Sequence, residues 1–255
     1  MGRSLIIRKF AYTSLICSII PLHIPKPPHR PSHKRPPPMR KENFQWLFLA
    51  LMILFGLQAF ATDYFWVNGS GSWTDFTNHW ATSSGGNTFH DSVPGPADRV
   101  YFDANSFSAN GQTVLVDTSL AECLSLEFTG INFSPTFTGL LGDTLNVRDD
   151  FILNNSLNWS YLGLLLFSNG AFTDSTIALI DTAEIYLFGN TLDNTCVFNG
   201  QGLWEMHDNF KTSENIFFEQ GNLNFLADTL AALAFLVQDP VDTSVSSGGS
   251  FGLNR

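Results

Sequence analysis

The sequence predicts an all-β chain that folds as a right-handed parallel β-helix, or solenoid, with an aromatic cap at its N-terminal end. From residue 113 onward, short runs alternate apolar and polar residues, which is the two-residue period of a β-strand. Asn, Asp, Gly, Ser and Thr separate these runs and favour tight turns. Amphipathic helix patterns are nearly absent there. An antiparallel β-sandwich has similar strand spacing and is the alternative fold.

One stretch, residues 226–237, is compatible with a helix or with a pair of strands. Elsewhere the alternation is clear enough to place strands, and turns are expected at the Gly-containing breaks between them. The expected strands are residues 113–117, 124–128, 144–147, 177–180 and 184–188.

A weak internal repeat favours the solenoid over the sandwich. Residues 145–151 (LNVRDDF) resemble residues 204–210 (WEMHDNF) at a spacing of 59 residues. Similarity at a fixed spacing in a strand-and-turn chain is typical of solenoids, and this spacing fits two or three coils of roughly 20–30 residues each. Inward Leu, Ile, Phe and Val side chains would then stack from coil to coil.

A change of composition near residues 61–62 predicts export. Residues 39–61 have a basic start, an apolar run and the small residues Ala59 and Ala61 before a cleavage point, as in a signal peptide. Residues 1–38 contain a proline-rich basic run that cannot build a core, and we expect them to be disordered. Our interpretation is that translation starts at Met39. The rival interpretation is a cytoplasmic tail before an uncleaved signal anchor, which would be the only contact with a membrane.

The exported part is strongly acidic. Nine of the 13 Lys and Arg residues lie in residues 1–61, so residues 62–255 carry four basic and 22 acidic side chains. Binding of nucleic acid requires clustered Lys and Arg, which excludes that function. The partners that remain are neutral glycans, anionic ones held through a bridging cation, and other surface proteins. The two cysteines of this part, Cys123 and Cys196, are expected to be buried thiols.

The segment after the leader carries a motif rich in tryptophan and glycine. Residues 64–73 read YFWVNGSGSW, residues 78–86 read NHWATSSGG, and residues 94–103 read PGPADRVYFD. This segment resembles the opening module of large surface proteins that gliding bacteria export by the type IX secretion route. The resemblance implies a β-solenoid after the signal peptide, and it carries no specific activity. Members of that family continue into further repeats and a sorting domain, so the resemblance also implies that this chain is truncated.

The three tryptophans of the motif, Trp66, Trp73 and Trp80, are the candidate site residues. A solenoid needs a cap over its first coil, because an open edge invites aggregation, and large aromatics would supply one. The functional alternative is an exposed platform on which sugar rings stack. We expect the cap, because an aromatic packs more often than it binds. On this basis residues 62–112 form the cap segment and residues 113–255 the solenoid.

The sequence favours a non-catalytic protein. The basic residues of the exported part are scattered, and its histidines His79, His90 and His207 lie far apart, so neither set predicts a catalytic group. Metal-ligand spacing is absent, and calcium at Asp- and Asn-rich turns is the one cofactor left open. We therefore expect an exported structural or adhesive module of a larger protein. The alternative is a carbohydrate-binding or polysaccharide-degrading β-helix protein.

Overall fold

A computed structural model describes residues 61–168, 182–226, 229–237, 243–247 and 250–253. The chain divides into residues 1–57 and 58–255, and all described residues belong to the second unit. The upstream segment 1–38, the expected signal peptide 39–61 except Ala61, and the expected strand 177–180 lie outside the described residues. Among the residues that are described, no helix is both long and apolar enough to cross a membrane.

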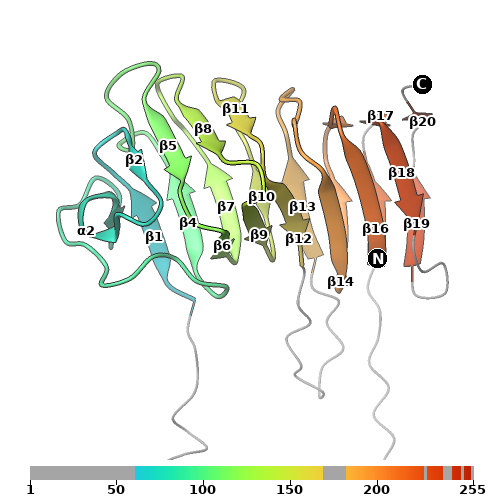
Figure 1. The fold of residues 1–255 in the computed structure, drawn as a ribbon, viewed down its shortest axis with the longest axis horizontal. Helices are drawn as coiled ribbons and strands as arrows, with labels where there is room; N and C mark the ends of the chain where they lie inside the picture. Colours follow the sequence, from blue (N-terminus) through green and yellow to red (C-terminus); the bar gives the residue numbers. More distant parts are fainter. Residues whose placement is uncertain (1–60, 169–181, 227–228, 238–242, 248–249, 254–255) are drawn as a thin grey trace, which may run out of the picture. The chain divides into compact units, whose positions relative to one another are not determined.

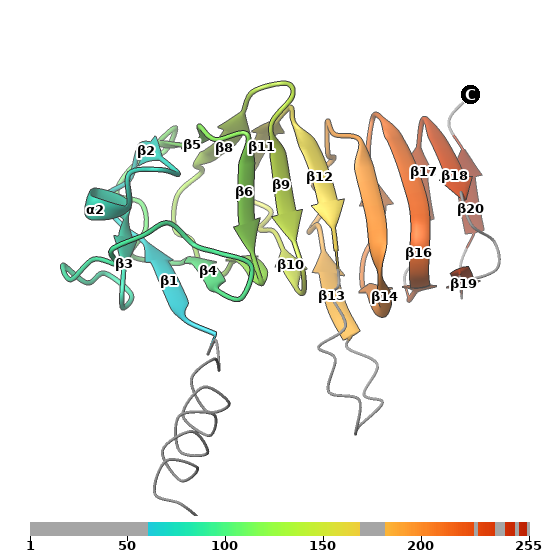
Figure 2. The ribbon, with the colours of Figure 1, turned by 60° about the horizontal axis from the view of Figure 1, so that its bottom comes forward.

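The described part is a parallel β-solenoid of about six turns, in which successive strands lie on three faces (Figure 1, Figure 2). Strand pairing between coils is parallel, apart from one antiparallel pair and one antiparallel bridge near the N-terminal end of this part. Val100 pairs with Leu126 and Trp204 with Leu223, so a coil takes 26 residues in the first case and 19 in the second. The parallel β-helix is therefore confirmed and the antiparallel sandwich is not adopted.

The first face is the longest run of paired strands. Its strands alternate buried and more exposed residues, as a sheet with one side on the core requires. Its outermost N-terminal strand also pairs antiparallel with β3 (Trp80–Ala81). The strands are β1 (Asp63–Trp66), β4 (Arg99–Phe102), β7 (Ser125–Phe128), β10 (Phe151–Ile152), β13 (Thr182–Tyr186), the second halves of β14 (Cys196–Met206) and β16 (Asn215–Phe225), and β19 (Thr243–Ser247).

The second face follows the first along each coil and consists of two groups of strands. A parallel bridge between Leu192 and Thr212 lies beside the second group. The strands are β2 (Gly71–Ser72), β5 (Thr113–Val116), β8 (Thr136–Gly139) and β11 (Asn158–Tyr161), and then β15 (Phe210–Lys211), β17 (Thr229–Ala232) and β20 (Ser250–Leu253).

The third face returns the chain to the first. In the coils of β14 and β16 a single strand runs from the third face around the corner to the first face. The strands are β6 (Leu120–Cys123), β9 (Thr144–Val147), β12 (Leu164–Phe167), the first halves of β14 and β16, and β18 (Ala234–Val237).

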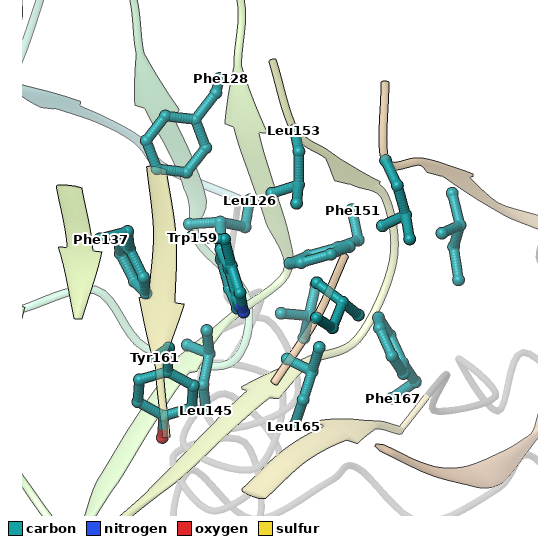
Figure 3. Packing of buried hydrophobic residues seen from close by; sticks show 14 of the residues in the cluster. Leu126, Phe128, Phe137, Leu145, Phe151, Leu153, Trp159, Tyr161, Leu165 and Phe167 are labelled. Carbon is teal, nitrogen blue, oxygen red and sulfur yellow. The ribbon is translucent and has the colours of Figure 1, made fainter. Parts of the chain in front are cut away.

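Aromatic side chains stack from coil to coil inside the solenoid. Because paired parallel strands place equivalent residues next to one another, an inward Phe on one coil meets an inward aromatic on the next. Each such side chain contributes about 1.5–3 kcal/mol by leaving water. Figure 3 shows this packed interior. Three stacked pairs are Phe102–Phe128 at 4.2 Å, Phe137–Trp159 at 5.1 Å and Phe167–Phe198 at 4.6 Å between ring centroids.

Two glycines leave room for the buried ring of Tyr161. A Cβ atom on Gly139 would collide with the ring, and one on Gly163 would lie 2.5 Å from the Tyr161 hydroxyl oxygen and would strike the carbonyl oxygen of Asp143. At the expected turns, Gly130 and Gly142 adopt φ of 68° and 101°, which glycine tolerates best.

One detail of the sequence-based prediction was wrong. The 59-residue repeat does not align coils, because Leu145 lies on the third face, paired with Leu165, whereas Trp204 lies on the first face, paired with Leu223. The strand β4, which precedes residue 113, already pairs with β7 on the stacked first face. Residues 226–237, compatible with helix or strands, contain the strands β17 and β18.

Candidate functional site

The three tryptophans of the motif are brought together at the N-terminal end of the core. Trp66 lies on β1, Trp80 on β3, and Trp73 directly follows β2. Trp80 is the central ring, with centroid distances of 4.8 Å to Trp66 and 4.9 Å to Trp73, both in edge-to-face geometry. All three have 0% exposure. In this arrangement no ring face is open to a sugar, so the tryptophans pack as a cap would and the sugar platform is not supported.

Hydrogen bonds fix this cluster to the local backbone. The indole N–H of Trp80 donates to the carbonyl oxygen of Trp73 at 2.7 Å, and that of Trp66 donates to Gly69 at 2.7 Å. His79, at the end of the short helix α2 (Phe76–His79), stacks on Trp66 at 4.5 Å, and its Nδ1 lies 2.8 Å from the carbonyl oxygen of Val67. A Cβ atom on Gly71 would collide with this imidazole. The Gly-Ser turn of the motif therefore makes room for the cluster.

Two lines of side chains run across the strands on the outward surface of the first face. One line of side chains, which we call the aromatic row, runs across successive strands at the spacing of a parallel sheet, about 4.8 Å. Phe65 stacks on Tyr101 at 5.1 Å and Tyr186 stacks on His207 at 4.4 Å. The aromatic row consists of Phe65, Tyr101, Glu127, Ile152, Tyr186 and His207.

A second line on the same surface is acidic, and we call it the carboxylate row. Glu184 pairs with Glu205, whose Oε1 accepts a hydrogen bond from the Asn224 amide at 3.0 Å. The backbone N–H of Glu184 donates to Oδ1 of Asp150 at 2.8 Å. The carboxylate row consists of Asp63, Arg99, Ser125, Asp150, Glu184, Glu205 and Asn224.

Burial and like charge change the acidity of this surface. Burial raises the pKa of the Glu127 carboxyl, and repulsion from Asp150 raises it further, against a hydrogen bond from Ser125. Burial also raises the pKa of Asp150, opposed by the backbone N–H of Glu184. The pKa of Tyr101 is raised by burial and then by Glu127. The surface therefore disfavours added negative charge.

Phe188 extends the aromatic row around the corner between the first and second faces. Its ring stacks on Tyr186 at 5.5 Å and an interplanar angle of 17°, and Tyr186 in turn stacks on His207. Phe188 is 50% exposed, although it is a large apolar side chain. The Nε2 atom of His207 is buried and has no hydrogen-bond partner among the described residues. These three rings form one stack, which is partly open to solvent.

A hollow of about 320 Å³ adjoins Phe188. Its lining includes Ile152, which belongs to the aromatic row, and the two asparagines Asn154 and Asn155. We call it the Phe188 hollow. It is lined by Phe128, Thr129, Gly130, Ile152, Leu153, Asn154, Asn155 and Phe188, none of which is charged.

A second depression lies at the corner between the second and third faces. This corner groove, of about 590 Å³, carries three carboxylates and no aromatic side chain. Leu141 and Leu162 on its rim are 87% and 50% exposed. It is lined by Leu141, Gly142, Asp143, Thr144, Leu162, Gly163, Leu164, Asp193, Thr195 and Glu214.

The described residues contain no group of three or more His, Cys, Asp or Glu side chains that is placed to hold a metal ion. Cys123 and Cys196 are free and fully buried, and burial raises the pKa of both thiols. Such thiols act as small apolar side chains, as their strand positions predicted.

Comparison of the chain with protein-family models, curated proteins and solved structures finds no match. The site is therefore judged on geometry alone. Sequence reasoning missed the surface of the first face, because it gave no role to the side chains of Tyr101, Tyr186 or Phe188. The alternation of β4 and β13 was the signal that could have found them, since it places Tyr101 and Tyr186 on the outward side.

Proposed function

We propose that the chain is an exported, non-catalytic structural and adhesive module of a larger surface protein, of the kind implied by its resemblance to type IX-secreted modules. The observation that carries the proposal is the outward surface of the first face. There the aromatic and carboxylate rows follow consecutive strands, so they form a long flat surface rather than a closed pocket. All members of the aromatic row are partly exposed, and contiguous apolar patches on a protein surface mark interaction sites.

The N-terminal cluster supports the structural half of the proposal. A solenoid exposes its core at the first coil unless a cap covers it. The tryptophans of the motif are buried against Phe102 on β4, at 5.7 Å from Trp66 and 6.0 Å from Trp80. This packing supports a capping role for the motif, and such a role fits a rigid spacer or display module.

The partner that we propose is a neutral glycan. The charge of residues 62–255 and the raised pKa of Glu127 and Asp150 disfavour polyanions, nucleic acid included. Aromatic rings bind the apolar C–H faces of sugars without needing charge, and Tyr101 and Tyr186 offer such rings on the outward side of the first face. The composition of the leader, residues 39–61, supports export to a compartment where glycans are met.

Polysaccharide hydrolysis is the second candidate, and one observation favours it. Glycoside hydrolases use two carboxyl groups, one of which has a raised pKa so that it stays protonated. Glu127 and Asp150 are neighbours on the first face, and burial raises the pKa of each. Release of reducing ends from a neutral polysaccharide, lost in Glu127→Gln, would establish this candidate and refute the non-catalytic proposal.

Retention on insoluble neutral polysaccharides tests the adhesive proposal. The exported product should be retained on cellulose, xylan or mannan, and the double variant Tyr101→Ala/Tyr186→Ala should be retained several-fold less. Leu141→Ala is the matched control, because it removes an exposed apolar side chain from the corner groove instead. Equal retention of the double variant, or no retention of the wild type on any of these polymers, would refute the adhesive role of the first face.

A further inference from the structure

Phe188 is held in a backbone conformation that does not suit it. Its φ is 49°, in the left-handed region that side chains with a Cβ atom rarely adopt. Half of its surface also remains in contact with water. Neither feature favours folding, and residues of this kind concentrate at functional sites. The strain is therefore a reason to look for a ligand of the Phe188 ring.

The surrounding chain fixes Phe188 in place. The two carboxylate oxygens of Asp208 accept hydrogen bonds from the backbone N–H groups of Leu187, at 2.9 Å, and of Phe188. The amide of Asn190 donates to the carbonyl oxygen of Asn154 on the neighbouring coil at 3.0 Å. The ring is thus presented on a turn that is tied down on two sides. A pre-organised contact of this kind lowers the entropic cost of binding.

The Phe188 hollow has the composition of a small neutral binding site. Its volume, about 320 Å³, is at the low end of the range for ligand pockets, about 300–1,000 Å³, and suits one or two sugar rings. Its lining includes the partly buried Ile152, the exposed Phe188, and the two asparagines Asn154 and Asn155. An apolar wall with a few polar groups is the usual pattern in such sites.

We propose that the Phe188 hollow binds one ring of a neutral glycan, with a C–H face of the sugar on Phe188 and its hydroxyl groups at the amide of Asn155. The inference rests on the proposed adhesive function, and it names the place and the chemical class of the partner. The charge of the surroundings favours a neutral ligand, because the lining is uncharged and the Asp208 carboxylate accepts a hydrogen bond from the backbone N–H of Phe188. A uronic acid would bring its own carboxylate toward Asp208 and is disfavoured.

The test is calorimetric titration of the exported product of the full chain with β-1,4-linked hexamers of glucose, of xylose and of mannose. Binding of at least one hexamer is expected. The variant Phe188→Gly should weaken it about tenfold or more, the loss expected for one stacked aromatic contact. Asn155→Ala should weaken binding of the same hexamer by a smaller factor, since it removes a single hydrogen-bonding group.

Phe188→Gly also separates binding from folding. Glycine adopts the left-handed backbone conformation freely, so this variant should not lower the thermal unfolding midpoint. It should nevertheless lose binding of the hexamer. Leu141→Gly, in the corner groove, is the control for removal of an exposed apolar side chain and should leave hexamer binding unchanged.

The outcomes distinguish the hollow from the wider proposal. Hexamer binding that persists in Phe188→Gly but is lost in Tyr101→Ala would overturn the hollow and leave the adhesive first face standing. Tighter binding of a galacturonic acid hexamer than of every neutral hexamer would refute the assignment of a neutral glycan as the ligand. Failure of all three neutral hexamers to bind would overturn the inference, whatever the retention on polysaccharides shows.

Discussion

Replacement of Trp80 by alanine is the most informative perturbation of the fold. Trp80 has 0% exposure, is in edge-to-face contact with Trp66 and Trp73, and donates a hydrogen bond of 2.7 Å to the Trp73 carbonyl. Loss of a buried Trp side chain costs about 3–5 kcal/mol. The buried carbonyl left without its donor places this site at the upper end of that range.

That loss should be large on the scale of the whole molecule. The free energy of unfolding of a domain is about 5–15 kcal/mol, and about 1 kcal/mol shifts the midpoint of a domain of this size by about 2–4 °C. Trp80→Ala should therefore lower the thermal unfolding midpoint of the exported product by about 10–20 °C. Circular dichroism at a strand wavelength measures it directly.

Two further variants make the Trp80 result interpretable. Trp80→Phe keeps an aromatic ring and loses the hydrogen bond, so its thermal unfolding midpoint should lie between those of the wild type and of Trp80→Ala. Leu141→Ala removes a side chain that is 87% exposed and should change the free energy of unfolding by less than about 0.5 kcal/mol. If Trp80→Ala lowers the midpoint by no more than Leu141→Ala but abolishes retention on polysaccharide, the capping role is wrong and the sugar platform is restored.

Three more predictions follow from single residues. Gly163→Ala should destabilise the protein by about 1–3 kcal/mol in urea unfolding, because its Cβ would strike the Tyr161 hydroxyl; no loss would contradict the packing at that corner. Glu127→Gln should be more stable than the wild type at about pH 7, since burial and Asp150 raise the folded-state pKa above the ordinary value and so disfavour the ionised form. That gain should vanish at about pH 3.5, where the carboxyl is protonated in both states, and a gain that grows on acidification would refute the sign. The Cys196 thiol should resist iodoacetamide in the native protein and react in denaturant, and rapid native labelling would contradict its burial.

The sequence was sufficient to predict the fold class because it shows the two-residue period of β-strands and almost no helical period. Alternation in runs such as residues 113–117 and 144–147 marks strands, and these became β5 and β9 with the inward residues buried. Because helical periods are nearly absent, the candidate folds were the β-sandwich and the β-solenoid. Coil length could not be counted from the 59-residue repeat, because strands on different faces share the same apolar alternation and resemble one another equally well.

The candidate site was harder to predict for a different physical reason. The signal for a cap, three tryptophans spaced by seven, lies within one continuous segment, so it can be read locally. The aromatic row draws Tyr101 and Tyr186 from strands 85 residues apart, and only the register of the coils brings them onto one line. The left-handed backbone of Phe188 has no sequence signal, because a Phe-Gly pair places the expected positive φ on Gly189 alone.

The most direct test of the central claim is carbodiimide labelling of carboxyl groups with and without a saturating neutral hexamer. The outward carboxylates Asp150, Glu184 and Glu205 lie on the first face, while Asp143 and Asp193 lie in the corner groove and provide an internal control. If the first face binds the glycan, the hexamer should slow labelling of the first three groups and leave the other two unchanged. Protection of Asp143 and Asp193 instead, or of none of the five, would contradict the claim.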